Sequence, residues 1–178
     1  MVAQALAGSQ TAFEQILRRY QRPVLGLLVR LTGDAGLAED LTQETFVKAF
    51  RNLAAFDPRR RLSSWLFRIA HNTGIDALRK AKLPTVPMDD GRLLDEPTAP
   101  AAGDPVVRRA LGRALDGALL QLRPDQRTAV VLRYDAGLSF EEIGQVLGIP
   151  EPTARSHVHR ARKELARLLT AAGWTPDR

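Results

Sequence analysis

The chain of 178 residues contains no cysteine, which excludes disulfide bonds and metal sites built from thiolates. Histidine is scarce as well, and on a helix His157 and His159 would lie about 200° apart, too far round to share one metal ion. No glycine-rich phosphate loop follows a strand. The carboxylates Glu39, Asp40 and Glu44 are better explained as a solvated or partner-binding helix face than as a catalytic cluster. We therefore predict that the chain is not an enzyme and has no metal site and no cofactor.

Long apolar runs are also absent. No segment approaches the roughly 20 consecutive apolar residues that a membrane-spanning helix needs. The first ten residues, MVAQALAGSQ, lack the basic and then apolar layout of a signal peptide. We expect a cytoplasmic protein that does not insert into a membrane. Hydrophobic residues still make up 44% of the chain, which is enough for a core.

Charge is distributed unevenly around a net value of +6. Residues 1–82 carry 13 basic and 7 acidic side chains (+6), and residues 106–178 carry 12 and 8 (+4). Residues 83–105 carry one basic and five acidic side chains (−4) and five of the eleven prolines. Because proline breaks helices and strand ladders, we predict a flexible acidic linker over 83–105, with a maximum reach of about 75 Å. It would join two basic domains, 1–82 and 106–178, whose charge favours nucleic acid as a partner.

Apolar residues recur with helical spacing in the first domain, and nothing there indicates a strand. One helix should start at a capping box made by Thr11 and Glu14 and end at Gly33, with Pro23 kinking or interrupting it. A second should cover residues 37–53, and a third should start near Ser63. The apolar stripe of the third helix includes Trp65, for which we favour a core position over a role as a stacking platform for a base. Its opposite side would carry the side chains Ser64, Arg68, His71, Asn72, Ile75 and Arg79.

The second domain contains the stretch SFEEIGQVLGIPEPTARSHVHRARK, residues 139–163. Ser139 and Glu142 have the spacing of a capping box, Gly148 suits the left-handed end of a helix, and Pro152 suits the first turn of the next helix. Two short helices joined by so tight a turn must cross at a large angle. We therefore predict a helix-turn-helix and, for the whole chain, an all-α fold of two small helical domains.

The second helix of this motif has two different faces. Residues with alternating spacings of four and three form its core side: Ala154, Val158, Ala161, Leu165 and Leu168. Basic and hydroxyl side chains form or flank its outward side: Arg155, Ser156, His159, Arg160 and Lys163. Arginine can bind a guanine edge through two hydrogen bonds, and lysine supplies charge for phosphates. Any surface helix can carry Arg and Lys, but the tight turn and the basic leading edge together favour DNA reading.

Three segments, in this order around an acidic linker, resemble the extracytoplasmic-function sigma factors of bacteria: AEDLTQETFVKAF (38–50), SSWLFRIAHNTGIDALRK (63–80) and the helix-turn-helix. These factors keep only the second and fourth conserved regions of the larger sigma-70 family. The resemblance covers about residues 11–82 and 108–170. DLTQETF and WLFRIAHN in tandem are specific signals, whereas a helix-turn-helix alone is a weak one.

The resemblance implies three sets of contacts. Docking on the clamp helices of core RNA polymerase would involve Asp40, Gln43, Glu44, Phe46 and Lys48. Recognition and melting of the −10 promoter element, with one flipped base, would involve Phe56, Arg59, Arg60, Arg61, Leu62, Arg68, Asn72 and Arg79. Reading of the −35 element would involve Thr153, Arg155, Ser156, His159, Arg160 and Lys163. His157 departs from the basic residue that is common at its position in the family.

The implied function is an alternative sigma factor that binds core RNA polymerase and directs it to promoters, with an anti-sigma factor as a further partner. Two other classes stay open. An autonomous helix-turn-helix regulator would bind duplex DNA tightly without polymerase and prefer a two-fold symmetric site. A helical scaffold for an acidic protein would show no activity that depends on DNA.

Overall fold

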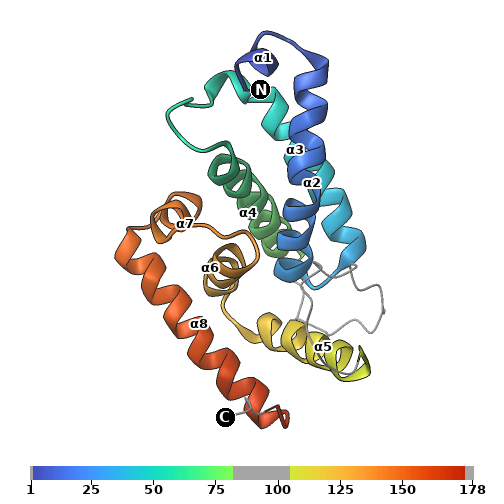
Figure 1. Cartoon of the computed structure of the whole chain (residues 1–178), viewed down its shortest axis with the longest axis vertical. Coiled ribbons are helices and arrows are strands. Elements are labelled where there is room, and N and C mark those ends of the chain that lie inside the picture. Colours follow the sequence, from blue (N-terminus) through green and yellow to red (C-terminus); the bar gives the residue numbers. More distant parts are fainter. Residues whose placement is uncertain (1, 82–104, 175–178) are drawn as a thin grey trace.

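A computed structural model describes residues 2–81 and 105–174 of the chain (Figure 1). Within these ranges every regular element is a helix, which confirms the all-α prediction. Residues 2–81, here called the N-terminal module, form α1 (Val2–Leu6), α2 (Gln10–Thr32), α3 (Ala35–Arg51), the short 3-10 helix η1 (Leu53–Ala55) and α4 (Leu62–Ala81). Residues 105–174, the C-terminal module, form α5 (Pro105–Gln121), α6 (Pro124–Tyr134), α7 (Phe140–Leu147) and α8 (Glu151–Ala171). The predicted linker lies outside the described residues, except that Pro105 begins α5.

The ends of α2 show which local signals were interpreted correctly. The predicted capping box at Thr11 is wrong, because the Ser9 side chain accepts a hydrogen bond from the Ala12 amide and the helix starts at Gln10. At the other end Gly33 has a φ of 76° and its N–H bonds to Val29, which confirms the predicted cap. Pro23 lies inside the helix without ending it.

The next two helices begin one or two residues earlier than predicted. Asp34 caps α3 by accepting from the Leu37 amide at 2.9 Å, so the helix starts at Ala35. It ends at Arg51, after which the chain tightens into η1. Helix α4 starts at Leu62. These shifts do not change which side chains share a face.

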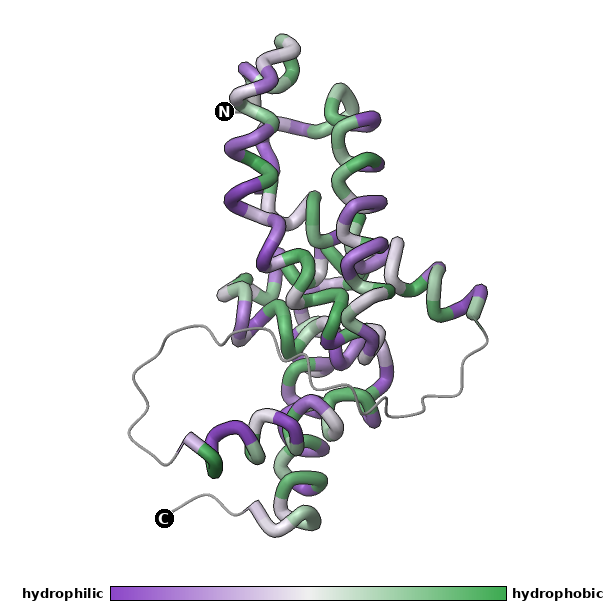
Figure 2. The backbone as a smooth tube through the Cα atoms, turned by 90° about the vertical axis from the view of Figure 1, so that its right-hand side faces the viewer, coloured by the Kyte–Doolittle hydropathy of each residue, from purple (hydrophilic) through white to green (hydrophobic). Residues whose placement is uncertain are grey.

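Helices α2, α3 and α4 pack together in the N-terminal module, and α8 packs on α5, α6 and α7 in the C-terminal module. Figure 2 shows hydrophilic and hydrophobic residues alternating along these helices, as expected where one side of each helix is buried. In the part of the chain that the structure describes, no helix is both long and apolar enough to cross a membrane.

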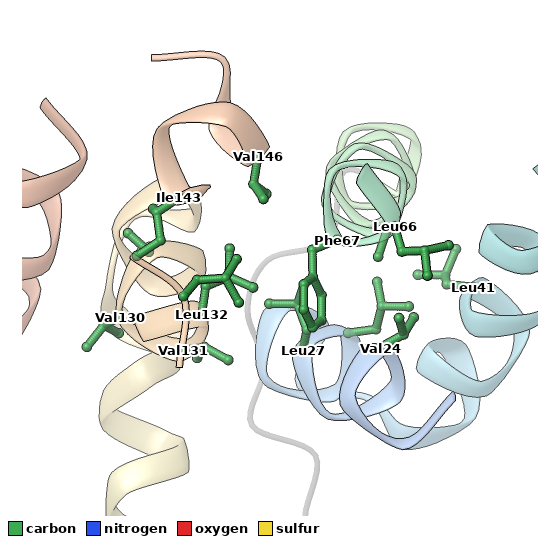
Figure 3. Close-up of a cluster of buried hydrophobic side chains, with 14 of the residues drawn as sticks. Val24, Leu27, Leu41, Leu66, Phe67, Val130, Val131, Leu132, Ile143 and Val146 are labelled. Carbon is green, nitrogen blue, oxygen red and sulfur yellow. The ribbon is translucent and has the colours of Figure 1, made fainter. Parts of the chain in front are cut away.

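The two modules pack against each other and share one hydrophobic core. Helix α4 contacts α7, and α2 contacts both α5 and α6. In Figure 3 Leu27 and Phe67 of the N-terminal module point toward Val131 and Leu132 of the C-terminal module. The approach is close at Gly33, where an added Cβ would lie 2.9 Å from a methyl group of Leu120. The sequence did not predict this contact.

Arg127 of α6 lies at the junction, with an exposed fraction of only 4%. Its guanidinium donates to the Leu31 carbonyl in the last turn of α2, and also to the carbonyls of Leu120 (2.6 Å) and Leu122 (3.0 Å) at the end of α5. The carboxyl end of a helix carries unpaired carbonyls and about half a negative charge. Two such ends compensate the buried cation, although no carboxylate pairs with it among the described residues.

Candidate nucleic-acid interface

The turn between α7 and α8 has the predicted geometry. Ser139 and Glu142 form a complete capping box, and Gly148 ends α7 with a φ of 69°. The turn also requires Gly144, because an added Cβ would lie 2.7 Å from the carbonyl oxygen of Ile149. Sequence reasoning missed this glycine, whose position inside a helical pattern gave the only signal. The tight turn fixes the direction in which α8 leaves the module.

The faces of α8 agree with the predicted helical wheel. Ala154, Val158 and Ala161 are buried. Outside lie the exposed side chains Arg155, Ser156, His159, Arg160 and Lys163, while Thr153 is half-buried. Arg155 makes an ion pair with Glu151 at 2.7 Å and keeps 62% of its side chain exposed. The first two turns of α8 therefore present a basic, accessible edge.

His157 differs from its exposed neighbours on α8. Its side chain is half-buried, and its Nδ1 atom is buried without a hydrogen-bond partner among the described residues. The imidazole thus lies at the flank of the packed face, where the helical wheel placed it. His157 is therefore less exposed than His159, two residues further along α8.

The polar face of α3 is exposed at Asp40, Gln43 and Glu44. Lys48 is half-buried: it pairs with Glu44 at 2.7 Å and donates to the Thr73 hydroxyl of α4 at 3.2 Å. Phe46, which was predicted among the docking residues, is buried, with an exposed fraction of 4%. Its ring packs with the ring of Phe50, at a centroid distance of 6.0 Å. The Phe46 ring therefore packs in the core rather than on the acidic face of α3.

The segment between η1 and α4 holds the three consecutive arginines. Arg59 and Arg60 pair with Asp57, at 3.0 and 3.9 Å, and hydrogen bonds from Arg59 lower the pKa of the Asp57 carboxyl. Arg61 reaches the other module and pairs with Glu142 of α7 at 3.2 Å. All three arginines are exposed, and Leu62 is half-buried at the start of α4.

Phe56 does not lie on the surface as expected, because only 6% of it is exposed. Its ring packs on the ring of Trp65, edge to face, with centroids 5.3 Å apart. Trp65 is half-buried and therefore has a second side that is not part of the core. That side lines a cavity of about 380 Å³ together with Lys48, Asn52, Ala55, Ile69, Asn72 and Thr73. Asn52, which follows α3, lines this cavity and was not among the predicted site residues.

Helix α4 is buried on two sides. Arg68, Asn72 and Arg79 are exposed on one stripe, as predicted, but Ser64 and His71 are buried, with exposed fractions of 2% and 6%. The prediction that these two share the outward side is wrong: His71 lies against α6 of the C-terminal module, and α7 of the same module packs on α4.

The His71 ring sits between side chains of α6. Nδ1 lies 3.0 Å from the Thr128 hydroxyl, and Nε2 lies 3.7 Å from the Asp125 carboxylate. Burial lowers the pKa of the imidazole, and the Asp125 charge opposes that shift. The ring therefore sits as a neutral group in the contact between the modules.

A second hollow of about 540 Å³ lies on the C-terminal module, beside Arg30 of α2. Its walls come mainly from α5, α6 and α8 and are largely apolar, with Leu111, Leu115, Leu165, Leu169 and Trp174 among the lining residues. Tyr134, at its rim, is 58% exposed. This groove is separate from the basic edge of α8.

Comparison with known protein families finds two matches along the chain. Residues 16–83 match the family described as Sigma-70 region 2, and residues 112–165 match Sigma-70, region 4. The chain is 34% identical to the ECF RNA polymerase sigma factor SigW of Bacillus subtilis, over 94% of each protein. It is 40% identical to the RNA polymerase sigma factor CarQ of Myxococcus xanthus, over 91% of each.

Two solved structures of complexes also contain chains that are similar to this one. CnrH in complex with the cytosolic domain of CnrY is similar with a TM-score of 0.71 and 31% identity, covering 96% of this chain and 95% of that one. The sigma factor RpoE in complex with the anti-sigma factor NepR, from Bartonella quintana, also has a TM-score of 0.71, with 27% identity, 89% of this chain and 97% of that one.

Proposed function

The chain belongs to the extracytoplasmic-function family of RNA polymerase sigma factors, and on that premise we propose how its surfaces divide the work of promoter selection. It directs RNA polymerase to promoters as a transcription initiation factor. It would act in the cytoplasm, where RNA polymerase transcribes, and add no catalytic chemistry of its own. Separate surfaces of the chain would bind the −35 element, the −10 element and the polymerase.

The −35 element would be read by α8. The observation that carries this assignment is the exposed basic edge on the first turns of α8, held outward by the tight turn at Gly144 and Gly148. Side chains near the amino end of such a helix reach base edges first when it enters a major groove. Arg155 and Arg160 would contact bases, whereas Lys163 would contact phosphate.

The −10 element would be bound by the arginine segment and the exposed stripe of α4. Arg59, Arg60 and Arg61 supply charge for the phosphates of a separated strand. The cavity beside Trp65 would hold one extruded base, since its volume of about 380 Å³ lies in the range of small-ligand sites, roughly 300–1,000 Å³. Trp65 offers an aromatic face for stacking, and the amides of Asn52 and Asn72 offer donors and acceptors for a base edge.

Both elements can be reached together only if the modules separate. Elements centred about 35 and 10 base pairs upstream lie about 25 base pairs apart, or roughly 85 Å of B-DNA at 3.4 Å per pair. Here Arg61 and Glu142, from opposite modules, are 3.2 Å apart. The conformation described is therefore a closed one, and binding to polymerase would separate the two modules.

Core RNA polymerase would dock on the acidic face of α3, at Asp40, Gln43 and Glu44. An anti-sigma factor would be a further partner, since the similar sigma factor RpoE forms a complex with the anti-sigma factor NepR. The apolar groove between α5, α6 and α8 is a suitable place for such a partner, since an exposed tyrosine at an apolar groove is typical of protein interfaces.

The test combines core binding with run-off transcription from a random promoter library. We expect the protein to bind bacterial core RNA polymerase and to select a two-part promoter. Arg155→Ala or Arg160→Ala should weaken dependence on the −35 element by about 1–3 kcal/mol for each hydrogen-bonded base that the variant no longer reaches. Unchanged promoter use in both variants would refute the assignment of α8. Tight binding to duplex DNA, without any binding to core, would favour an autonomous regulator.

A further inference from the structure

Phe140, the first residue of α7, lies where three helices meet. Two guanidinium groups lie over its ring: that of Arg133 from α6, at 4.7 Å from the ring centroid, and that of Arg155 from α8, at 4.6 Å. The ring is half-buried and packs on the hydrophobic core at the same time. The face of an aromatic ring attracts cations, and arginine stacks well because its guanidinium is planar.

The two arginines differ in what else holds them. Arg133 is half-buried, and its Nη1 donates to the Leu138 carbonyl at 2.8 Å, in the turn between α6 and α7. Its contacts therefore end inside the module. Arg155 is exposed, and its Nη2 donates to the Glu151 carboxylate at 2.7 Å, one turn earlier on α8. Arg155 is thus held at two points while most of its side chain remains in solvent.

We propose that Phe140 is a positioning residue that sets the −35 specificity of Arg155. The ring holds the guanidinium by its face, which leaves the N–H groups at the edge that do not donate to Glu151 available for paired hydrogen bonds with a guanine. An arginine side chain that is already ordered before DNA binds loses less rotamer entropy on binding. This entropic advantage is greatest at the base whose hydrogen-bonding groups match the position of the held guanidinium. This inference rests on the proposed role of α8 as the −35 reader.

The experiment is a double-mutant cycle with Phe140→Leu and Arg155→Ala in the holoenzyme. Leucine keeps much of the apolar packing but has no π-face. The measurement is the ratio of run-off transcription from the selected promoter to that from a promoter changed at the −35 base pair whose preference Arg155→Ala relaxes. We expect Phe140→Leu to reduce this ratio about two- to fivefold, the size of a cation–π contact at an exposed site. Phe140→Trp, which keeps an aromatic face, should restore it.

The diagnostic result comes from the double variant. If Phe140 acts through Arg155, Phe140→Leu should change the ratio no further once Arg155 is alanine. An equal loss in both backgrounds, or an equal loss at every −35 base pair, would overturn the proposal and leave Phe140 a structural residue. Tyr20→Leu removes a half-buried aromatic ring of the N-terminal module that also lies under an arginine, with the Arg19 guanidinium 5.6 Å from the ring centroid, and should leave the ratio unchanged.

The role of α8 as the −35 reader and the role of Phe140 in positioning Arg155 can be refuted separately. If Arg155→Ala does not alter −35 preference at any position, the assignment of α8 is wrong, and the role of Phe140 is wrong with it. If Arg155→Ala relaxes one position while Phe140→Leu matches wild type there, α8 remains the reader and only the role of Phe140 is refuted.

Discussion

Replacing Arg127 with methionine removes a buried cation that donates hydrogen bonds to carbonyls at the carboxyl ends of two helices. Three carbonyls lose their donor, on Leu31 of α2 and on Leu120 and Leu122 at the end of α5. Hydrogen bonds from a charged group contribute roughly 1.5–3 kcal/mol each, so three give about 4.5–9 kcal/mol. The cost of burying the charge opposes this sum, and the same burial lowers the pKa of the guanidinium. We expect a net loss of about 2–5 kcal/mol in the free energy of unfolding.

The hydrogen bond from Arg127 to Leu31 also joins the two modules, so its loss should make unfolding of the two modules less cooperative. The chain has two tryptophans, Trp65 in α4 and Trp174 just after α8, and thus one in each module. Urea unfolding would be followed by fluorescence in Trp65→Phe and Trp174→Phe backgrounds. With Arg127 present, the two midpoints should coincide, because the modules share one core. With methionine in its place, the midpoints should move apart.

Arg30→Met is the matched control. Arg30 also links the modules, through a 3.1 Å pair with Asp135, but its side chain is 29% exposed and that of Asp135 is 44% exposed. A pair so open to water contributes less than about 1 kcal/mol. If Arg127→Met costs no more than Arg30→Met and the two tryptophan midpoints still coincide, the reasoning about helix ends is refuted.

Two further predictions concern single surfaces. Reversing charge at Asp40 and Glu44 to lysine should reduce affinity for core polymerase at least about tenfold, while the melting temperature stays near wild type, since Glu44 loses only an exposed pair with Lys48. Wild-type affinity in a competition assay would place the docking face elsewhere. His71 has a folded pKa below its usual 6.5, so the unfolded chain binds its proton more readily. The contribution of His71 to the free energy of unfolding should therefore be complete above pH 6.5 and decline on acidification. In urea titrations, the difference in that free energy between wild type and His71→Asn should shrink below pH 6.5.

The parts of the fold that the sequence predicted are those fixed by neighbouring residues. The helix-turn-helix depends on Ser139, Glu142 and Gly148, which act within one or two turns of each other. The outward side of α8 can be predicted because the apolar residues of this helix repeat at spacings of four and three, which places them on a single packed face. Such features need no knowledge of distant segments, which is why a helical wheel places Arg155 and His159 on the surface.

The parts that it could not predict depend on the contact between the modules. A wheel assigns one buried side to α4, yet Ser64 and His71 on its other side are also buried, and His71 contacts a helix more than 50 residues further along the chain. Arg127 carries a charge and would ordinarily be placed in solvent. Its burial makes sense only once the ends of α2 and α5 converge on it, and no local pattern encodes that convergence.

The polar contacts between the modules suit an interface that, in the proposed function, has to open. A purely apolar junction would expose its whole area to water on separation, whereas a hydrogen bond at the junction can be exchanged for one to water, which recovers part of its energy. Arg61 shows how DNA could drive the exchange. Its guanidinium is 77% exposed and already pairs with one anionic group, the Glu142 carboxylate. A phosphate of the −10 strand offers the same charge and a similar geometry to that guanidinium. Binding of that strand would thus replace a contact that holds the modules together, so recognition of the −10 element and release of the C-terminal module toward the −35 element would favour each other.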